Sequence, residues 1–293
     1  MMLRLLSWLV GLLPERWTAR LGAALGWLAF SVLRVRRRVA VDNLRRSLGL
    51  PRRPAERLAR RVYSHLATGA LEFLQVHRLS LVRSRALLGD RILERIDRLR
   101  QGRGLLILTA HLGQWDLLAC AAGLCGVPLH VVTRSVKNRC INRLWMERRR
   151  RCGVRLLPAR GSARAAMRAL EDDEVVALVL DQHDPEGAAV PLFGRPAATS
   201  TALARMARAS GAPVLPVFLV RDERGAGFRL VVKELIDVPR TPDRWGDVLA
   251  ATTRFNQTIE EVVRAYPDQW LWLHRRWKID ELPLRIGRQP TIV

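Results

Sequence analysis

The strongest constraint on the fold is a regular alternation of short apolar runs and helix-forming stretches that begins at Gly104. The apolar runs are rich in Val, Ile and Leu, as expected of buried strands: GLLILTA, PLHVVT, VRLLP, EVVALVL, PVLPVFLV and, further on, FRLVV. Between and after them, helices are predicted over residues 115–124, 138–151, 162–170, 200–209 and 243–265. This spacing predicts βαβ units, and therefore an α/β fold with a mainly parallel sheet flanked by helices.

The N-terminal residues have a different character. Two apolar segments, residues 5–13 and 21–33, are each shorter than the roughly 20 residues that cross a bilayer. Trp8, Trp17 and Trp27 lie among leucines, and an arginine-rich run follows the second segment. That arrangement predicts a helical anchor in the membrane interface, beside anionic headgroups. A secretory signal and a pair of buried core helices are the alternative interpretations.

The chain is accordingly divided into a membrane-anchoring helical segment, residues 1–40, and a larger domain, residues 41–293. At the start of that domain, residues 43–76 predict two helical segments broken at the sequence LPRRPAER. Glu72 is an acidic residue in the apolar stretch GALEFLQV. It is either functional or a core carboxylate paired with one of the many arginines.

Composition restricts the partners and the chemistry. Fifty Lys and Arg against 27 Asp and Glu give a formal charge of +23, which indicates an anionic partner: lipid, an acidic carrier protein or nucleic acid. Codon bias in a high-GC genome is another source of the arginine excess. The basic runs lack the aromatic residues or zinc framework of nucleic-acid modules, so no nucleic acid is expected. The sequence contains no phosphate-binding glycine motif and no G-x-S-x-G elbow, so nucleotide-dependent and serine-hydrolase chemistry lose support.

The segment LLILTAHLGQWDLL places a histidine directly after a predicted strand, where ligands collect in parallel α/β sheets. His111 and Asp116 are separated by about one helical turn plus a loop residue, so the carboxylate is predicted to accept from one imidazole nitrogen. The other nitrogen would be a general base for an alcohol that attacks an ester or thioester. A structural histidine at a strand end is the alternative. A metal site of His111 with Asp181, His183 and Asp184 is a second one.

Four sequence blocks in this order resemble the lipid A biosynthesis acyltransferases of the lysophospholipid acyltransferase superfamily. They are H-x4-D after a strand, a strand ending in DQ, VPLFG before a Thr/Ser-rich helix start, and PDQWLWLHRRWK. The resemblance covers nearly the whole chain, including VDNLRRSL. It implies a membrane-associated O-acyltransferase of the bacterial inner membrane with its site on the cytoplasmic side. The donor would be acyl carrier protein or acyl-CoA, the acceptor a glycolipid hydroxyl, and no cofactor or metal is implied.

The resemblance also implies roles for individual residues. His111 would be the base and Asp116 its orienting carboxylate. Arg149, within ERRRRCG, would hold a phosphate of either substrate. Asp181 would orient the acceptor or support the arginine. Arg195, Thr199 and Ser200 would form an anion site where a loop enters a helix, unless the hydroxyls only cap that helix.

Other functions remain open at this point. The block after the histidine carries Asp rather than Glu, and the chain has only two tyrosines, so acyl length and acceptor do not transfer from the family. Related branches acylate mannosylated or ornithine-containing lipids, which makes another lysolipid or glycolipid an alternative acceptor. A non-catalytic basic protein on membranes or nucleic acid is the alternative of a different class, and it predicts strong salt dependence without any effect of a histidine substitution.

Overall fold

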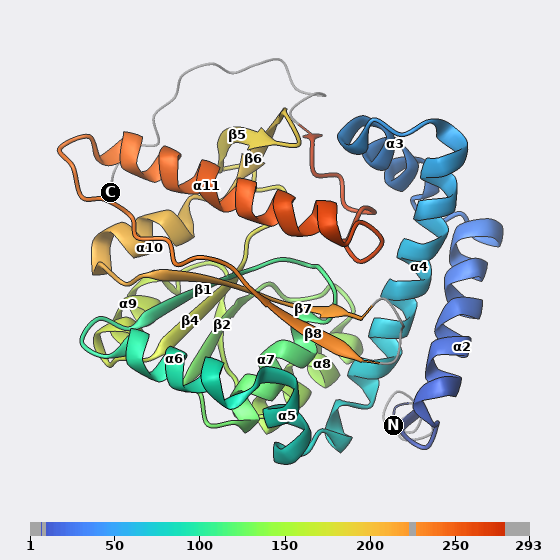
Figure 1. Ribbon diagram of the computed structural model, residues 1–293, viewed down its shortest axis with the longest axis horizontal. Coiled ribbons are helices and arrows are strands. Elements are labelled where there is room, and N and C mark those ends of the chain that lie inside the picture. The colour runs from blue at the N-terminus through green and yellow to red at the C-terminus, as the bar shows by residue number, and fades with distance from the viewer. Residues whose placement is uncertain (1–6, 8–9, 223–226, 279–293) are drawn as a thin grey trace.

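The computed structural model describes residues 7, 10–222 and 227–278, and its centre is a six-stranded sheet in the order β3-β2-β4-β1-β7-β8 (Figure 1). Neighbouring strands are parallel except β8, which pairs antiparallel with β7 at the edge. The strands are β1 Leu105–Thr109, β2 Leu129–Thr133, β3 Arg155–Pro158, β4 Val175–Val179, β7 Val214–Arg221 and β8 Phe228–Val232. The predicted α/β fold with a mainly parallel sheet is confirmed.

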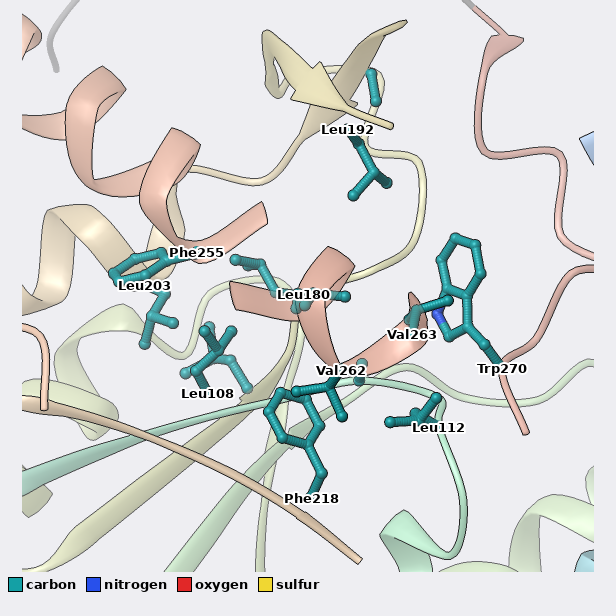
Figure 2. Close-up of a cluster of buried hydrophobic side chains, with 14 of the residues drawn as sticks. Leu108, Leu112, Leu180, Leu192, Leu203, Phe218, Phe255, Val262, Val263 and Trp270 are labelled. Carbon is teal, nitrogen blue, oxygen red and sulfur yellow. The ribbon is translucent and has the colours of Figure 1, made fainter. Parts of the chain in front are cut away.

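Helices cover both faces of the sheet, which is why its strands read as nearly continuous apolar runs. Leu106 and Leu108 of β1 face one layer, and Leu105 and Ile107 face the other. The first layer is α9 Ala163–Glu171, α10 Ala202–Ser210 and α11 Arg244–Ala265; the second includes α5 Leu81–Leu88, α6 Asp90–Arg100 and α7 Trp115–Leu124. Figure 2 shows part of the interface between the sheet and the first helix layer, where Leu108 lies near Leu203 and Phe255.

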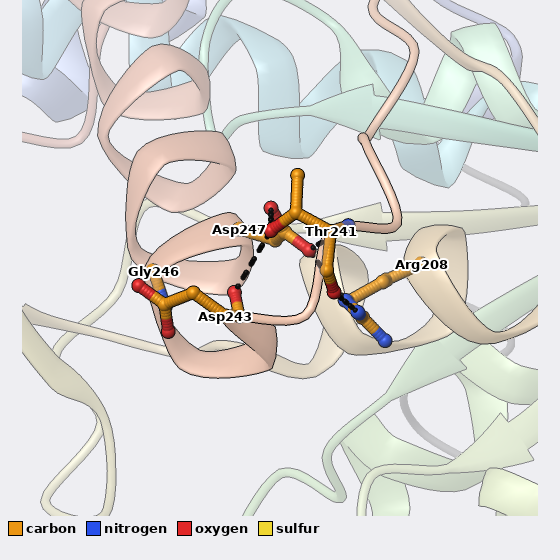
Figure 3. Close-up of polar contacts among 5 residues, drawn as sticks. All are labelled: Arg208, Thr241, Asp243, Gly246 and Asp247. Carbon is orange, nitrogen blue, oxygen red and sulfur yellow. Dashed lines mark hydrogen bonds and ion pairs between the residues drawn. The ribbon is translucent and has the colours of Figure 1, made fainter.

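A polar network fastens the start of α11 to α10 (Figure 3). Arg208 donates from Nε to Asp247 Oδ2 at 2.8 Å, and Thr241 donates from Oγ1 to Asp247 Oδ1 at 2.8 Å. Asp243 accepts from the backbone N–H of Gly246, which caps the helix. These contacts join the C-terminal end of α10 to the start of α11, at the end of the first layer away from the candidate site.

A two-stranded antiparallel hairpin, β5 Ala188–Leu192 and β6 Arg195–Thr199, was not predicted from the sequence. Phe193 and Gly194 join the strands with φ of 53° and 69°, the conformation of a type I′ turn. The predicted loop-to-helix position of Arg195 and Thr199 is therefore wrong, because both residues belong to β6. The following helix, α10, begins only at Ala202.

The N-terminal part is helical: α2 Glu15–Trp27, the π-helical turn η1 Leu28–Val32, α3 Arg37–Leu48 and α4 Arg52–Leu74. The break between α3 and α4 falls at LPRRPAER as predicted, where Gly49 adopts a φ of 65°. The helices α2 and α4 run side by side (Figure 1), and a Cβ on Gly26 would lie 2.5 Å from the backbone nitrogen of Ser64. Within the described residues, no helix is both long enough and apolar enough to span a membrane.

Candidate active site

Two polar side chains follow the adjacent parallel strands β1 and β4 and meet at the carboxyl edge of the sheet. His111 Nδ1 lies 2.7 Å from Asp181 Oδ1. The second oxygen of Asp181 accepts from the backbone N–H of His111 at 2.9 Å and from the indole N–H of Trp270 at 2.7 Å. The Asp181 side chain is only 2% exposed, whereas that of His111 is 21% exposed. A buried Asp181 therefore fixes the orientation of His111 by hydrogen bonds, while the His111 ring remains partly exposed to solvent.

The environment of Asp181 favours its charged form. Burial raises the pKa of this carboxyl, but the adjacent His111 and the hydrogen bonds from Trp270 and the backbone outweigh it, and the pKa is lowered. An ionised Asp181 accepts a hydrogen bond from the N–H at His111 Nδ1. The proton of the neutral imidazole therefore stays on Nδ1, and the lone pair on Nε2 can act as a base. Consistent with that tautomer, the side-chain amide nitrogen of Gln182 lies 3.4 Å from His111 Nε2.

The predicted contact between His111 and Asp116 is wrong. Asp116 is 3% exposed in the first turn of α7, and its Oδ1 accepts from Arg149 Nε at 2.8 Å, Arg149 Nη2 at 2.5 Å and Trp145 Nε1 at 3.2 Å. The reason is electrostatic: a buried guanidinium requires a counter-charge, and Asp116 is the carboxylate that the start of α7 turns toward α8 Arg139–Arg151. The carboxylate beside the histidine is Asp181, and not Asp116 as predicted.

Of the four arginines in ERRRRCG, Arg149 is the one that faces the site. It is 8% exposed, and its Nη1 donates to Thr133 Oγ1 at 3.0 Å. Arg150 and Arg151 are exposed, and Arg148 donates to Ser7 Oγ instead. The expectation that Asp181 supports this arginine is not met, because the carboxylate that contacts Arg149 is Asp116.

The loop between His111 and α7 is fixed from three sides. Gly113 has a φ of 59°, and a Cβ there would lie 2.1 Å from the carbonyl oxygen of Leu219. Gly113 N–H donates to Gln269 O, and the amide of Gln114 donates to Glu72. Glu72 also accepts from Arg221 Nη2 at 2.7 Å, so the interpretation of this residue as a carboxylate paired with an arginine is confirmed.

The C-terminal block QWLWLHRRW packs against this loop. Trp270, Trp272 and Trp277 are buried. His274 Nε2 accepts from the backbone N–H of His183 at 2.9 Å. Burial lowers the pKa of His274 to about 4, so the group is neutral at neutral pH. Its contribution to stability is complete above the unfolded pKa of about 6.5 and is lost as the pH falls toward 4.

The three residues of the predicted anion site separate in the structure. Ser200 lines the cleft beside His111. Thr199 is fully buried, donates to Ala197 O, and accepts from Arg276 and Asn256. The guanidinium of Arg195 lies over the ring of Trp277, with its Cζ 4.5 Å from the centroid. Helix capping by Thr199 or Ser200 is also wrong, since Thr201 occupies the N-cap position of α10.

Arg276 is 1% exposed and donates to Ala198 O and Thr199 Oγ1, so it joins the C-terminal block to β6. A metal site at the DQHD segment also finds no support. In the described parts of the chain, no three His, Cys, Asp or Glu side chains come together as a metal would require. Both oxygens of Asp181 are instead hydrogen-bonded, to His111 and to Trp270.

Two cavities meet at the site. A cleft of about 540 Å³ contains His111 and has Thr133, Arg149, Gln182 and Ser200 among its polar walls. The second cavity lies between the sheet and helices α5, α6 and α7, and its walls are almost entirely apolar: they include Leu88, Ile92, Ile96, Ile107, Ala122, Val127, Leu129 and Ala177. Trp115, Val131, Arg149 and Val179 line both. The base therefore stands in a cleft lined by both polar and apolar side chains, with an almost entirely apolar cavity on the other side of a shared wall.

Comparison with known proteins identifies the family of the chain. The model of the bacterial lipid A biosynthesis acyltransferase family matches residues 2–279. The chain is 30% identical to the lipid A biosynthesis lauroyltransferase of Escherichia coli and 26% identical to the palmitoleoyltransferase of that organism, each over 92% of this chain and 88% of the relative. It is also 26% identical to the phosphatidylinositol mannoside acyltransferase of Mycobacterium tuberculosis, over 81% of this chain and 76% of the relative. The chain is an acyltransferase and belongs to the bacterial lipid A biosynthesis acyltransferase family.

Proposed function

We propose that this protein transfers a fatty acyl chain from a thioester, on acyl carrier protein or coenzyme A, to a hydroxyl of a glycolipid at the membrane surface. The observation that carries the proposal is the His111–Asp181 pair in a cleft of mixed polar and apolar lining that shares a wall with an apolar cavity. The acceptor class is supported by the relatives, which are named for lipid A and for a phosphatidylinositol mannoside. A lipid A precursor is the acceptor we favour, and another glycolipid is the alternative.

In the proposed reaction, His111 Nε2 removes the proton of the acceptor hydroxyl as that oxygen attacks the thioester carbonyl. Asp181 stabilises the imidazolium that forms and keeps the ring in the productive orientation. The tetrahedral intermediate then collapses, the carbon–sulfur bond breaks, and the leaving sulfur takes the proton from Nε2. An ester and a free thiol result, and the protein ends in its starting state.

The remaining groups are assigned to binding. Arg149, held by Asp116, presents a buried positive charge to the cleft, and we assign it to a phosphate of the acceptor or donor. Ser200, on the cleft wall, would supply a hydroxyl to the same polar group. The apolar cavity under α5, α6 and α7, which is about 70 Å³, would receive part of the acyl chain, where each buried CH₂ contributes about 0.8 kcal/mol.

Lipid mass spectrometry tests this function most simply. Lipids are compared from a Gram-negative host with the protein, without it, and with His111→Ala. The proposal predicts one glycolipid whose mass rises by a single acyl group only when the wild-type protein is present. An unchanged glycolipid profile together with accumulation of free fatty acid would point to a hydrolase. The acyl mass and the identity of the shifted lipid name the chain length and the acceptor.

We further propose that α2 and η1 lie on the membrane. An exposed apolar stripe runs along them at helical spacing: Trp17 is 49% exposed, Leu21 38%, Leu25 40%, Leu28 38% and Val32 54%. The arginines at positions 34, 36 and 38 follow the stripe and suit anionic headgroups. Burial of one such side chain is worth about 1.5–3 kcal/mol, so several together outweigh the contribution that salt screens.

High salt is therefore expected to leave the protein in the membrane pellet, whereas detergent releases it. The double substitution Leu21→Glu/Leu25→Glu should move most of the protein to the supernatant, measured by flotation on anionic vesicles. Trp245→Glu is the matched control and should still float, because Trp245 is an exposed apolar residue in the first turn of α11, a helix that begins on the side of the molecule opposite α2 (Figure 1). Release of the wild-type protein by salt alone would show that the stripe does not enter the membrane.

A further inference from the structure

Helix α3 contributes a polar side chain to the C-terminal block. Asn43 is half-buried, and its Nδ2 lies 2.9 Å from Trp272 O and 2.9 Å from His274 O. Both acceptors are carbonyl oxygens, so the nitrogen end of the amide must face them, and the two N–H groups of that nitrogen match the two acceptors. These contacts join residues more than 200 positions apart in the chain.

The block needs such a tie because it has no regular secondary structure over most of its length. A single bridge pairs Leu112 with Trp270, and the backbone N–H of Leu271 donates to His111 O at 3.1 Å. Beyond Leu271, Asn43 holds the carbonyls of residues 272 and 274. The stretch from Trp270 to His274 is thus fixed at its start by the histidine loop and at its end by α3, before Arg276 joins the block to β6.

The block contacts the loop after β4 at each of these two ends, through Trp270 at the first and His274 at the second. The indole of Trp270 donates to Asp181 at 2.7 Å, and the imidazole of His274 accepts from His183 N–H at 2.9 Å. Asp181 in turn orients His111. A shift of the block would move the indole that fixes one oxygen of Asp181, and with it the direction of the base.

We propose that Asn43 is a positioning residue for acyl transfer: it holds the C-terminal block so that Trp270 and Asp181 keep His111 in its reactive orientation. This inference rests on the proposed function of the His111–Asp181 pair. It gives α3 a part in building the site. The amide of Asn43 does not touch the reacting atoms, so its effect belongs to turnover rather than to substrate binding.

The test compares Asn43→Asp, which keeps the shape but turns oxygen toward two carbonyls, with Leu44→Ala on the same helix. Leu44 is fully buried, and its truncation destabilises α3 without removing a hydrogen bond to the block. Asn43→Asp should lower kcat about 10- to 100-fold with little change in KM, because a small misplacement of a catalytic group has that effect. Leu44→Ala should keep kcat, and Asn43→Gln, which retains both donors, should recover part of the loss.

A spectroscopic readout separates this inference from the proposed function. The indole N–H resonance of Trp270, assigned with Trp270→Phe, should shift in Asn43→Asp and stay in place in Leu44→Ala, whether or not the protein transfers acyl chains. Wild-type kcat and an unshifted indole in Asn43→Asp would overturn the inference while leaving the acyltransferase proposal intact. Equal kcat losses in Asn43→Asp and Leu44→Ala at matched melting temperature would also overturn it, since the role would then be structural.

Discussion

Substitution of His111 by alanine is expected to lower kcat/KM for acyl transfer about 10²- to 10⁴-fold, the usual contribution of a general base. The protein should remain folded, because His111 lies at a strand end with 21% of its side chain exposed and fills no core space. The measurement is acyl transfer to a purified glycolipid acceptor, with circular dichroism as the folding control. His77→Ala, an exposed histidine outside the cleft, should retain wild-type rates. Near-wild-type transfer by His111→Ala would remove the proposed mechanism.

Asp181→Asn is expected to have an effect of similar size, about 10²- to 10⁴-fold in kcat. The substitution conserves shape but removes the charge that stabilises the imidazolium, and an amide nitrogen can face His111 Nδ1 and stabilise the unreactive tautomer. Because the folded-state pKa of Asp181 is lowered, its contribution to stability exists above the unfolded pKa of about 3.9 and is lost only in acid. At neutral pH this contribution is present in the wild type and absent from Asp181→Asn, so the melting temperature of the variant is measured together with its kcat.

Asp116→Asn is the matched comparison for Asp181→Asn. It leaves the buried guanidinium of Arg149 without its counter-charge, so we expect a lower melting temperature and a raised KM for the phosphorylated substrate. The imidazole keeps its partner in this variant, and kcat should fall less than in Asp181→Asn. If Asp116→Asn lost as much in kcat as Asp181→Asn and kept its KM, the orienting role would belong to Asp116 after all.

Much of the fold was predictable because its signals are local. Buried parallel strands require apolar residues on both faces, and the runs before His111 and Asp181 show that requirement directly. The break between α3 and α4 is encoded by Gly49 and the prolines that follow it. The β5–β6 hairpin was missed because its turn residue Phe193 has a positive φ that no local pattern of a bulky residue suggests.

The candidate site was only partly predictable for the opposite reason, since its contacts are remote in sequence. Spacing alone favoured Asp116 as the partner of His111, but the partner is Asp181, which is 70 positions away and is brought near by the pairing of β1 with β4. Asp116 instead forms an ion pair with the buried guanidinium of Arg149. Thr199 was expected at an anion site or a helix cap, but it is buried against Arg276, a residue 77 positions away, because β6 packs against the C-terminal block.

Time-resolved intact-protein mass spectrometry tests the central claim, direct transfer to an acceptor that His111 activates. The purified protein is mixed with an acyl thioester, alone and with glycolipid, and is quenched over the first turnovers. The account predicts that the protein mass never changes, and that the glycolipid gains one acyl group as the free thiol appears. An acyl adduct on the protein that forms at the rate of turnover and disappears on addition of the acceptor would contradict it, because the reaction would then pass through a covalent enzyme intermediate.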